Sequence, residues 1–318
     1  MNANFSTVIT TTLQNHGNKI FDAVTTNNAL LSLLKKKGNI KVVSGGYEFT
    51  HPLIYGKNAS FKSYPKLGVI ETPNTDNITR AVYAQKVVAG SLVLSTLEVA
   101  QNAGNREKLL DLTQVKKMEA EISMTEVMGD QVFASGAVAT DFDGLPYLIN
   151  LSPSTQTDVG NINSTTYSYW RNQVDTTGTS GFNSNSAGVT LMNSMLNSCT
   201  FGLQGPNAII TTKTVYGLYE IGLTSLVRYQ RTDLGDLGFR YLAYTTMPMM
   251  FDDNCATGYM YFVDTDSLWL QVLARGNMEI TNFEWSHNQL SRIALMYIFG
   301  NLTCGSRRTQ GLLTSITA

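Results

Sequence analysis

The side chains that could carry out acid–base or metal chemistry are few in this sequence and lie far apart. The three histidines, His16, His51 and His287, show no metal-ligand spacing with one another or with a cysteine. His287, close to Glu284, is the best candidate for a general base, but no GxSxG turn supplies a nucleophile to go with it. We therefore expect His287 to be a surface or interface residue.

The residue patterns of phosphate and thiol chemistry are missing as well. No GxxxxGK[ST] loop is present, and no GxGxxG turn follows a predicted strand. Cys199, Cys255 and Cys304 are odd in number and form no CxxC pair. This argues against a disulfide framework or a zinc site and indicates a reducing compartment. We expect no catalytic, cofactor-binding or metal site, and the chain is predicted not to be an enzyme.

The charge of the chain is low for a protein that stays monomeric in water. Charged residues make up 15% of the 318 residues and the net charge is -1, against roughly 25% charged residues in a typical soluble protein. Asn, Thr, Ser and Gly fill the polar positions instead, which favours surfaces that contact other protein chains. The pI of about 6.3 indicates no electrostatic footprint for tight nucleic-acid binding. No apolar run is long enough to predict a membrane span.

The chain begins with a predicted helix. Apolar residues recur at three- and four-residue steps from Thr10 to Lys37, and Gly38 follows as a plausible stop. Lys35 to Lys37 stand where cations favour a helix C-terminus. We interpret these lysines as a solvated helix end and not as a DNA-binding site.

A hairpin with a long tip is predicted next. Residues 47–55 and 81–88 both alternate with period two, and Pro52 makes the first of these an edge strand. Residues 56–79 join them, a length at which structureless connections are uncommon. Because a two-stranded hairpin is at best marginally stable alone in water, we expect support from outside its own subunit.

A long helix follows the hairpin. Ser95 and Glu98 have capping-box spacing and open a short helix, after which residues 105–134 are predicted to form one long helix. Its apolar residues are predicted to lie on a single stripe. They are Leu109, Leu112, Val115, Met118, Ile122 and Met128.

The rest of the chain mixes strands and helices. The segment GLPYLINL, residues 144–151, is strand-like, and no regular βαβ repeat is present, so the predicted class is α+β. One segment, DVGNINSTTYSYWRNQV, places Trp170 and Arg171 among small polar residues. Such residues suit adaptable turns, whereas Trp, Tyr and Arg are the types that dominate contact energies.

The order of these elements, together with several phrases, resembles a known family. The phrases are NASFKSYPKLGVIETPNTDNITRAVYAQKVVAGSLVLSTLEVAQNAGNREKLLDL, GLPYLIN, VGNINSTTYSYWRNQV and LGFRYLAYTTMPMMFDD. From about Gly45 to Gly311 the chain resembles the major capsid proteins of tailed double-stranded DNA phages. Their fold is shared with encapsulins and the herpesvirus capsid floor.

The resemblance implies an α+β capsid fold with a defined order of domains. The expected parts are an N-terminal arm (1–44), an extended hairpin loop (45–94), a peripheral domain with a spine helix (95–160), a mainly axial domain (161–245), and axial strands that return to the peripheral domain (246–318). Because the hairpin begins near Gly45, we expect scaffolding to be supplied by a separate protein.

The resemblance also implies a structural function. The chain would assemble with itself into hexamers and pentamers of an icosahedral shell, made in the host cytoplasm and found in the virion capsid. The shell would enclose double-stranded DNA without sequence-specific binding, with a portal as a further partner and no membrane contact. The expected assembly interface comprises Lys57, Phe61, Tyr64, Leu67 and Ile70 of the hairpin tip with Tyr169, Trp170 and Arg171.

Three alternatives stay open at this point. Trp170 could fill the core of its own subunit instead of contacting a neighbour. The shell could be an encapsulin-like compartment that holds enzyme cargo. The third alternative is a cytoplasmic α/β hydrolase or transferase that uses His287.

Overall fold

The computed structural model describes residues 28–317, apart from 74–75, 102–105, 156–157, 178–180, 183–186 and 223–241. Most of the expected N-terminal arm, including His16, lies outside the described residues. The described part of the predicted first helix is α3 (Ala29–Lys37). The Asn28 side chain caps its start, accepting a hydrogen bond from the Leu31 amide at 3.0 Å. Gly38 ends it with a φ of 74° after three lysines in the last turn, as predicted.

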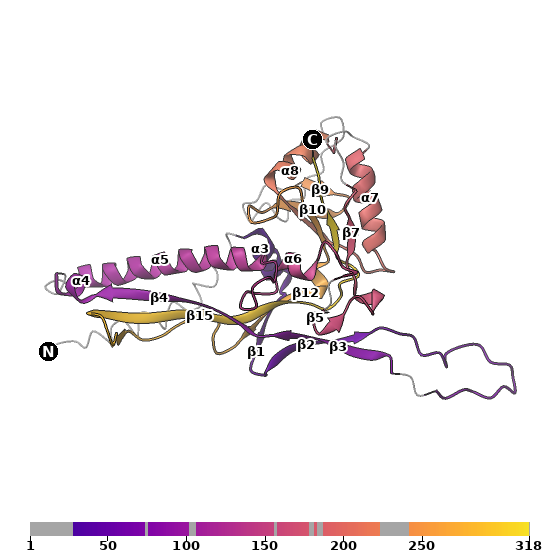
Figure 1. The fold of residues 1–318 in the computed structure, drawn as a ribbon, viewed down its shortest axis with the longest axis horizontal. Helices are drawn as coiled ribbons and strands as arrows, with labels where there is room; N and C mark the ends of the chain where they lie inside the picture. Colours follow the sequence, from indigo (N-terminus) through magenta and orange to yellow (C-terminus); the bar gives the residue numbers. More distant parts are fainter. Residues whose placement is uncertain are drawn as a thin grey trace.

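A long, narrow sheet forms one half of the body (Figure 1). β4 (Lys86–Ser95) and β15 (Ser291–Cys304) run antiparallel, from the pair Ser95 and Ser291 to the pair Lys86 and Gly300. β15 continues past β4 to pair with β12 (Leu268–Leu273), and β1 (Ile40–Val43) lies parallel to β12 on its other side. The sheet also includes β13 (Glu279–Ile280) and β14 (Glu284–Trp285).

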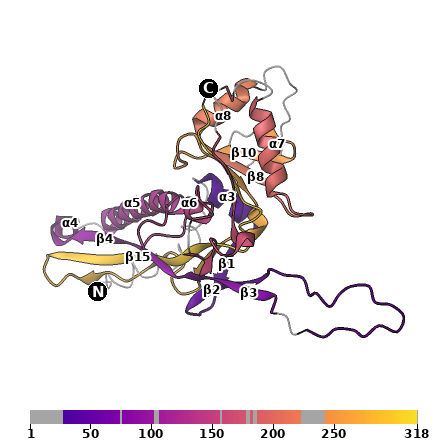
Figure 2. The ribbon, with the colours of Figure 1, turned by 45° about the vertical axis from the view of Figure 1, so that its right-hand side comes forward.

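Two helices lie beside this long sheet. α4 (Thr96–Gln101) begins with the predicted capping box. The Ser95 amide donates to Glu98 Oε2, and the Leu97 amide donates to Ser95 Oγ, both at 3.3 Å. α5 (Arg106–Val132) then runs back along β4 (Figures 1 and 2).

A second six-stranded sheet forms the other half of the body. Its strands in spatial order are β7 (Gln173–Asp175), β16 (Gly311–Leu313), β11 (Met260–Val263), β8 (Ala208–Thr211), β10 (Met247–Phe251) and β9 (Leu242–Tyr244). α7 (Ala187–Cys199) and α8 (Lys213–Gly222) pack with this sheet around their own buried cluster. Helices and mixed sheets in this arrangement make the class α+β, as predicted.

The predicted hairpin is present and stands apart from both large sheets. β2 (Glu48–Ile54) and β3 (Ile78–Ala84) pair antiparallel as a two-stranded sheet. The connection between them extends far from the body (Figures 1 and 2). A second small ribbon, β5 (Asp158–Val159) with β6 (Ile162–Asn163), lies near the base of the hairpin.

Residues 81–88, predicted as one strand, belong to two strands in different sheets. β3 ends at Ala84 and β4 begins at Lys86. In β3 the buried residues have odd numbers, Ala81 and Tyr83, whereas in β4 they have even numbers, Val88 and Leu92. The chain therefore leaves the hairpin and enters the body at Gln85, and the two strands head in opposite directions from there (Figure 1).

The predicted apolar stripe of the long helix is wrong. Val115, Met118 and Ile122 are exposed, whereas Met124 and Met128 are buried. Successive helical residues are rotated by about 100°, so Met128 lies about 240° around the helix from Ile122 and cannot share its face. The side chains of Leu109 and Leu112 lie outside the described residues.

The segment predicted as a strand at 144–151 is also different in the structure. Residues Leu145–Leu148 form the short helix α6, which carries a proline in its first turn. The Ile149 amide donates to the Leu145 carbonyl at 2.8 Å and closes this single turn.

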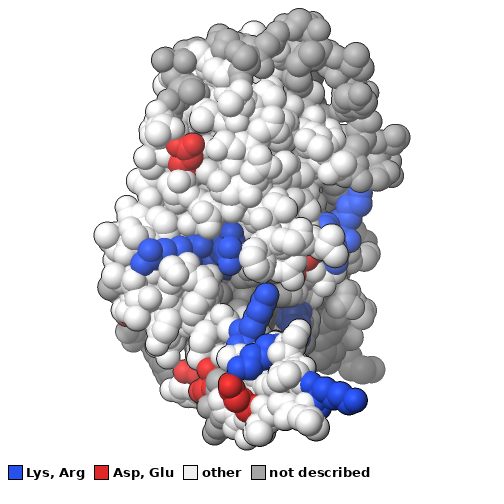
Figure 3. All heavy atoms as spheres, turned by 90° about the vertical axis from the view of Figure 1, so that its right-hand side faces the viewer, with Lys and Arg blue, Asp and Glu red and all other residues white. Residues whose placement is uncertain are grey.

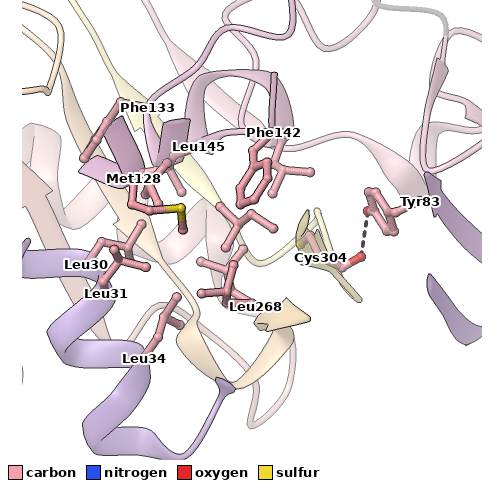
Figure 4. Packing of buried hydrophobic residues seen from close by; sticks show 14 of the residues in the cluster. Leu30, Leu31, Leu34, Tyr83, Met128, Phe133, Phe142, Leu145, Leu268 and Cys304 are labelled. Carbon is pink, nitrogen blue, oxygen red and sulfur yellow. Dashed lines mark hydrogen bonds between the residues drawn. The ribbon is translucent and has the colours of Figure 1, made fainter. Parts of the chain in front are cut away.

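The main core joins elements that are distant in sequence. Leu30, Leu31 and Leu34 of α3 pack into the same buried cluster as residues of α5, α6 and β12 (Figure 4). The partners labelled there are Met128, Phe133, Phe142, Leu145 and Leu268. The body is thus held together by its own core, without help from the hairpin tip.

Candidate assembly surface

The base of the hairpin is fixed to the body mainly through side chains. His51, on the inward face of β2, stacks on Trp269 with ring centroids 4.8 Å apart. His51 Nε2 lies 2.9 Å from Thr303 Oγ1 and 2.8 Å from Gln271 Nε2. Burial, with a smaller effect from Lys41, lowers the pKa of His51 to about 4, so this imidazole is neutral near pH 7.

Two hydrogen bonds donated by β3 strengthen the attachment. The buried Tyr83 hydroxyl donates to the Cys304 carbonyl at 2.8 Å (Figure 4). The Val82 amide donates to the Gly160 carbonyl at 2.9 Å. Burial raises the pKa of Tyr83 well above its usual value, so the hydroxyl stays protonated and remains a donor.

The small polar residues that follow Asp158 are explained by this contact. Gly160 and Asn161 both have positive φ, 62° and 58°, in the turn that joins β5 to β6. A Cβ at position 160 would lie 3.0 Å from Ala81 Cβ and 3.1 Å from Tyr83 Cζ. Glycine is therefore needed for the turn to approach β3 closely.

Trp170 lies in the core of its own chain, at the end of the 3₁₀ turn η1 (Ser168–Trp170). It is 1% exposed, and its Nε1 donates to the Val159 carbonyl at 2.7 Å. The structure thus corrects the interpretation of Trp170 as a contact for a neighbouring subunit and supports the alternative, in which it fills its own core. A tryptophan with its N–H satisfied inside the chain has no surface left for a partner.

Tyr169 and Arg171, the other two residues expected at an interface, also make contacts within the chain. Tyr169 stacks on Tyr55 at the end of β2, with centroids 5.2 Å apart. Arg171 donates from Nε to the Ser164 carbonyl and from Nη2 to the Thr165 carbonyl, both at 2.6 Å. Tyr169 therefore braces the base of the hairpin and Arg171 holds the loop after β6, and their expected contact with a neighbour stays a prediction.

Arg307 is a structural residue that the sequence pattern does not reveal. Its side chain is fully buried and donates to the Leu148 carbonyl at 2.7 Å, the Trp170 carbonyl at 3.1 Å and Asn172 Oδ1 at 3.0 Å. In sequence it is half of the pair Arg307–Arg308, and nothing in the pattern tells the two residues apart. Only the fold shows that one arginine is inside, while Arg308 stands over the Phe201 ring at 4.0 Å.

The tip of the hairpin is apolar and exposed. Phe61 is 87% exposed and Leu67 95%, and Ile70 is exposed as well. Val69, which was not among the expected interface residues, is 88% exposed. Leu67 and Val69 stand on either side of Gly68, whose amide closes a tight turn by donating to the Pro65 carbonyl at 2.8 Å.

Of the other two expected tip residues, Tyr64 has a local partner and Lys57 is exposed. The Tyr64 hydroxyl donates to the Ser60 carbonyl at 2.9 Å. Lys62 pairs with Glu71 at 2.9 Å across the loop and lies over the Tyr64 ring. On the face seen along the hairpin, charged side chains gather around the tip at the bottom, and most of the described surface above the tip on this face is uncharged (Figure 3).

The described part of the chain holds no group of three residues that could bind a metal ion. His287 is exposed between β14 and β15. The three cysteines are buried and unpaired, and burial raises the pKa of each thiol to about 12. Within the residues described, no helix is long and apolar enough to cross a membrane.

A projecting hairpin, a long helix beside a long ribbon and a second sheet with its own helices define the class of fold: the chain has the capsid fold of tailed phages. The sequence itself matches no protein-family model and no curated protein. The likeness lies in the three-dimensional structure.

Three solved structures illustrate it. The cyanophage A-1(L) capsid asymmetric unit contains a chain that superposes with a TM-score of 0.69 at 15% identity, covering 93% of this chain and 94% of that one. A chain from the capsid of a native GTA particle superposes with a TM-score of 0.55 at 10% identity, covering 88% of this chain and 89% of that one. An encapsulin from Synechococcus elongatus PCC 7942 superposes with a TM-score of 0.53 at 10% identity, covering 89% of this chain and 87% of that one.

Proposed function

We propose that this chain is the major shell subunit of a tailed phage. Copies assemble head to tail into hexamers and pentamers, and these close into an icosahedral shell around double-stranded DNA. The subunit performs no catalysis; its function is mechanical. Assembly in the host cytoplasm, a separate scaffolding protein and a portal belong to the same proposal.

One observation carries the proposal: the hairpin tip exposes its apolar side chains on a loop that leaves the body. A monomer gains nothing from holding Phe61, Leu67 and Val69 in water, because burial of one such side chain is worth about 1.5–3 kcal/mol. An exposed apolar patch of this kind marks a site of protein association. On a capsid fold, the partner expected for such a tip is a further copy of the same subunit.

The test is assembly of the purified chain. We expect closed shells in electron micrographs, and sedimentation far faster than that of a 34.9 kDa monomer. Addition of a scaffolding protein from the same genome should increase the yield and uniformity of the shells. A chain that stays monomeric at high concentration, with and without that protein, would refute the proposal.

An encapsulin-like compartment is the second candidate, because the encapsulin superposes over 89% of this chain. The phage shell is favoured because the cyanophage chain superposes more closely, with a TM-score of 0.69. The contents of particles from the native source decide between them. Packaged double-stranded DNA supports the phage shell, and an enclosed enzyme supports the compartment.

A further inference from the structure

The long helix α5 carries an apolar stripe that is exposed to water. Val115, Met118 and Ile122 are 62%, 61% and 53% exposed. Because successive helical residues are rotated by about 100°, these three side chains lie within about 60° of one another around the helix axis. Their steps of three and four residues are those of a seam between paired helices. An aligned set of large apolar side chains in water indicates a surface for a partner.

The stripe is not the side by which α5 is attached to its own body. Met124 and Met128 are buried in the main core. Lys116 and Ala120 line a groove that α5 shares with β4, the strand that lies along the helix in Figures 1 and 2. The stripe lies elsewhere around the helix, so it adds almost nothing to the fold of a single subunit.

The charges beside the stripe are acidic. Glu119, Glu121 and Glu126 lie within about 100° of its centre, whereas Lys116 and Lys117 lie more than about 120° away. Lys116 reaches Glu119 at 3.4 Å, and the buried Lys117 reaches Glu121 at 3.9 Å. Glu126 is exposed and forms no ion pair with any residue that the structure describes. A partner helix would therefore meet apolar side chains with carboxylates on both sides.

The open part of the stripe has a defined end. Gly129 follows Ile122 by seven residues and returns to within about 20° of it. A Cβ at Gly129 would lie 2.9 Å from Asn254 Nδ2 and 3.4 Å from Asn28 Nδ2, so these two side chains already cover this face. From Val115 to Glu126 the open stretch is about 17 Å long, or about three turns. Contacts of this small size are typical of reversible partners.

The described part of the chain supplies no helix of complementary chemistry. A match needs an apolar stripe with lysine or arginine beside it. α3 has three lysines in its last turn, but its leucines are buried in the core. α7 contains neither lysine nor arginine, and α8 contains only Lys213. The lysines of the hairpin tip stand on a loop without helix. These features favour a helix of a different protein.

We propose that the stripe formed by Val115, Met118 and Ile122 binds a basic amphipathic helix of the separate scaffolding protein. The apolar side of that helix covers the stripe, and its lysines or arginines face the carboxylates beside it. The contact rests on the proposed shell function and names the surface through which the subunit meets that protein. Each contact is weak, and many subunits that bind together give a strong attachment.

Peptide binding to the dilute subunit tests the contact. The probe is a fluorescent peptide of about three heptads with leucine at a and d and lysine at e and g, and its anisotropy is measured below the concentration at which the chain assembles. We expect saturable binding that Met118→Lys weakens at least about tenfold, because the substitution replaces an apolar contact by a like charge. Met118 is exposed, so the variant should keep the circular dichroism of the unmodified chain.

Two controls isolate the stripe and its charge. Leu203→Lys makes the same kind of change at a fully exposed leucine away from α5, and it should leave the peptide affinity within about twofold of the unmodified value. A peptide with glutamate in place of lysine at e and g should bind at least about tenfold more weakly.

The scaffolding protein itself gives the second measurement. Immobilised unmodified chain and Leu203→Lys should retain a scaffolding protein from the same genome, and Met118→Lys should lose it. The lysine peptide should displace the retained protein, because both bind the same stripe.

The outcomes separate this contact from the shell function. No binding of the lysine peptide to the unmodified chain, unchanged binding by Met118→Lys, or equal binding of the two peptides overturns the docking and leaves the shell function intact. If Met118→Lys leaves peptide binding unchanged but raises the concentration needed for unaided assembly, the stripe receives a second copy of this chain and the docking is wrong. Peptide binding by a chain that never forms shells would support the chemistry of the stripe and remove the shell function.

Discussion

At the scale of single residues, Arg307 joins the turn after β15 to two segments more than a hundred positions earlier. Arg307→Met removes donors to the Leu148 and Trp170 carbonyls and to Asn172 Oδ1. Asn172 Oδ1 keeps the Asn150 amide as a donor, but each of the two carbonyls left without this partner costs about 1–3 kcal/mol. We expect the free energy of unfolding in urea to fall by about 3 kcal/mol or more.

The neighbouring arginine provides the control. Arg308 is exposed and lies over the Phe201 ring, so Arg308→Met should cost no more than about 1 kcal/mol. If the two substitutions lower the free energy of unfolding equally, the buried hydrogen bonds of Arg307 add nothing beyond the packing of a long side chain.

His51 should make the attachment of the hairpin sensitive to pH. Its pKa is about 4 in the folded chain, below the ordinary value of 6.5. The unfolded chain therefore binds the proton first, and folding stability from neutral His51 is complete above pH 6.5 and is lost as the pH falls towards 4. Near neutral pH, His51→Gln should be less stable than the unmodified chain, and the difference should shrink in this window.

The unmodified chain must be compared with His51→Gln because Asp252 changes the folding stability with pH in the direction opposite to His51. Burial raises the pKa of its carboxyl group, so its contribution to stability increases as the pH falls. Urea unfolding of both chains from pH 7.5 to pH 4 gives the difference between their free energies of unfolding, from which the shared effect of Asp252 cancels. A constant difference between them across that range would contradict the role of His51.

At the scale of elements, α5 shows that burial does not follow hydrophobicity alone. Ile122→Ala should change the unfolding free energy of the monomer by about 0.5 kcal/mol or less because Ile122 is exposed. Met128→Ala should cost about 2–5 kcal/mol because Met128 is fully buried in the main cluster. Urea unfolding of dilute chains measures both, and similar costs would mean that the helix is rotated differently.

What the sequence could predict was local. The end of α3 at Gly38, the capping box at Ser95 and the alternation of β2 depend on neighbours within a few residues. The face of α5 that is buried and the place of Arg307 depend on elements that meet only in the folded chain. Trp170 belongs with these, because its type fits an interface and a core equally well.

At the scale of the whole molecule, two parts of the chain are stabilised in different ways. The body has large buried clusters and includes the hairpin base, which His51, Tyr83 and Gly160 hold in place. The tip beyond Ile54 and Ile78 has its largest apolar side chains in water. The fold of one subunit therefore does not need the tip, whereas the proposed shell does.

Shortening the hairpin separates these two requirements. Replacement of residues 56–76 by Asn-Gly keeps β2 and β3 paired through a tight turn and keeps Tyr55 on Tyr169. Because the removed residues contribute almost nothing to the core, we expect circular dichroism to be unchanged and the melting temperature to shift by no more than about 2–4 °C. Assembly should be abolished at concentrations where the full chain forms shells, as sedimentation and electron microscopy would show. A shortened chain that still closes into shells would prove that the tip is dispensable between subunits, and one that unfolds would prove that it supports its own body.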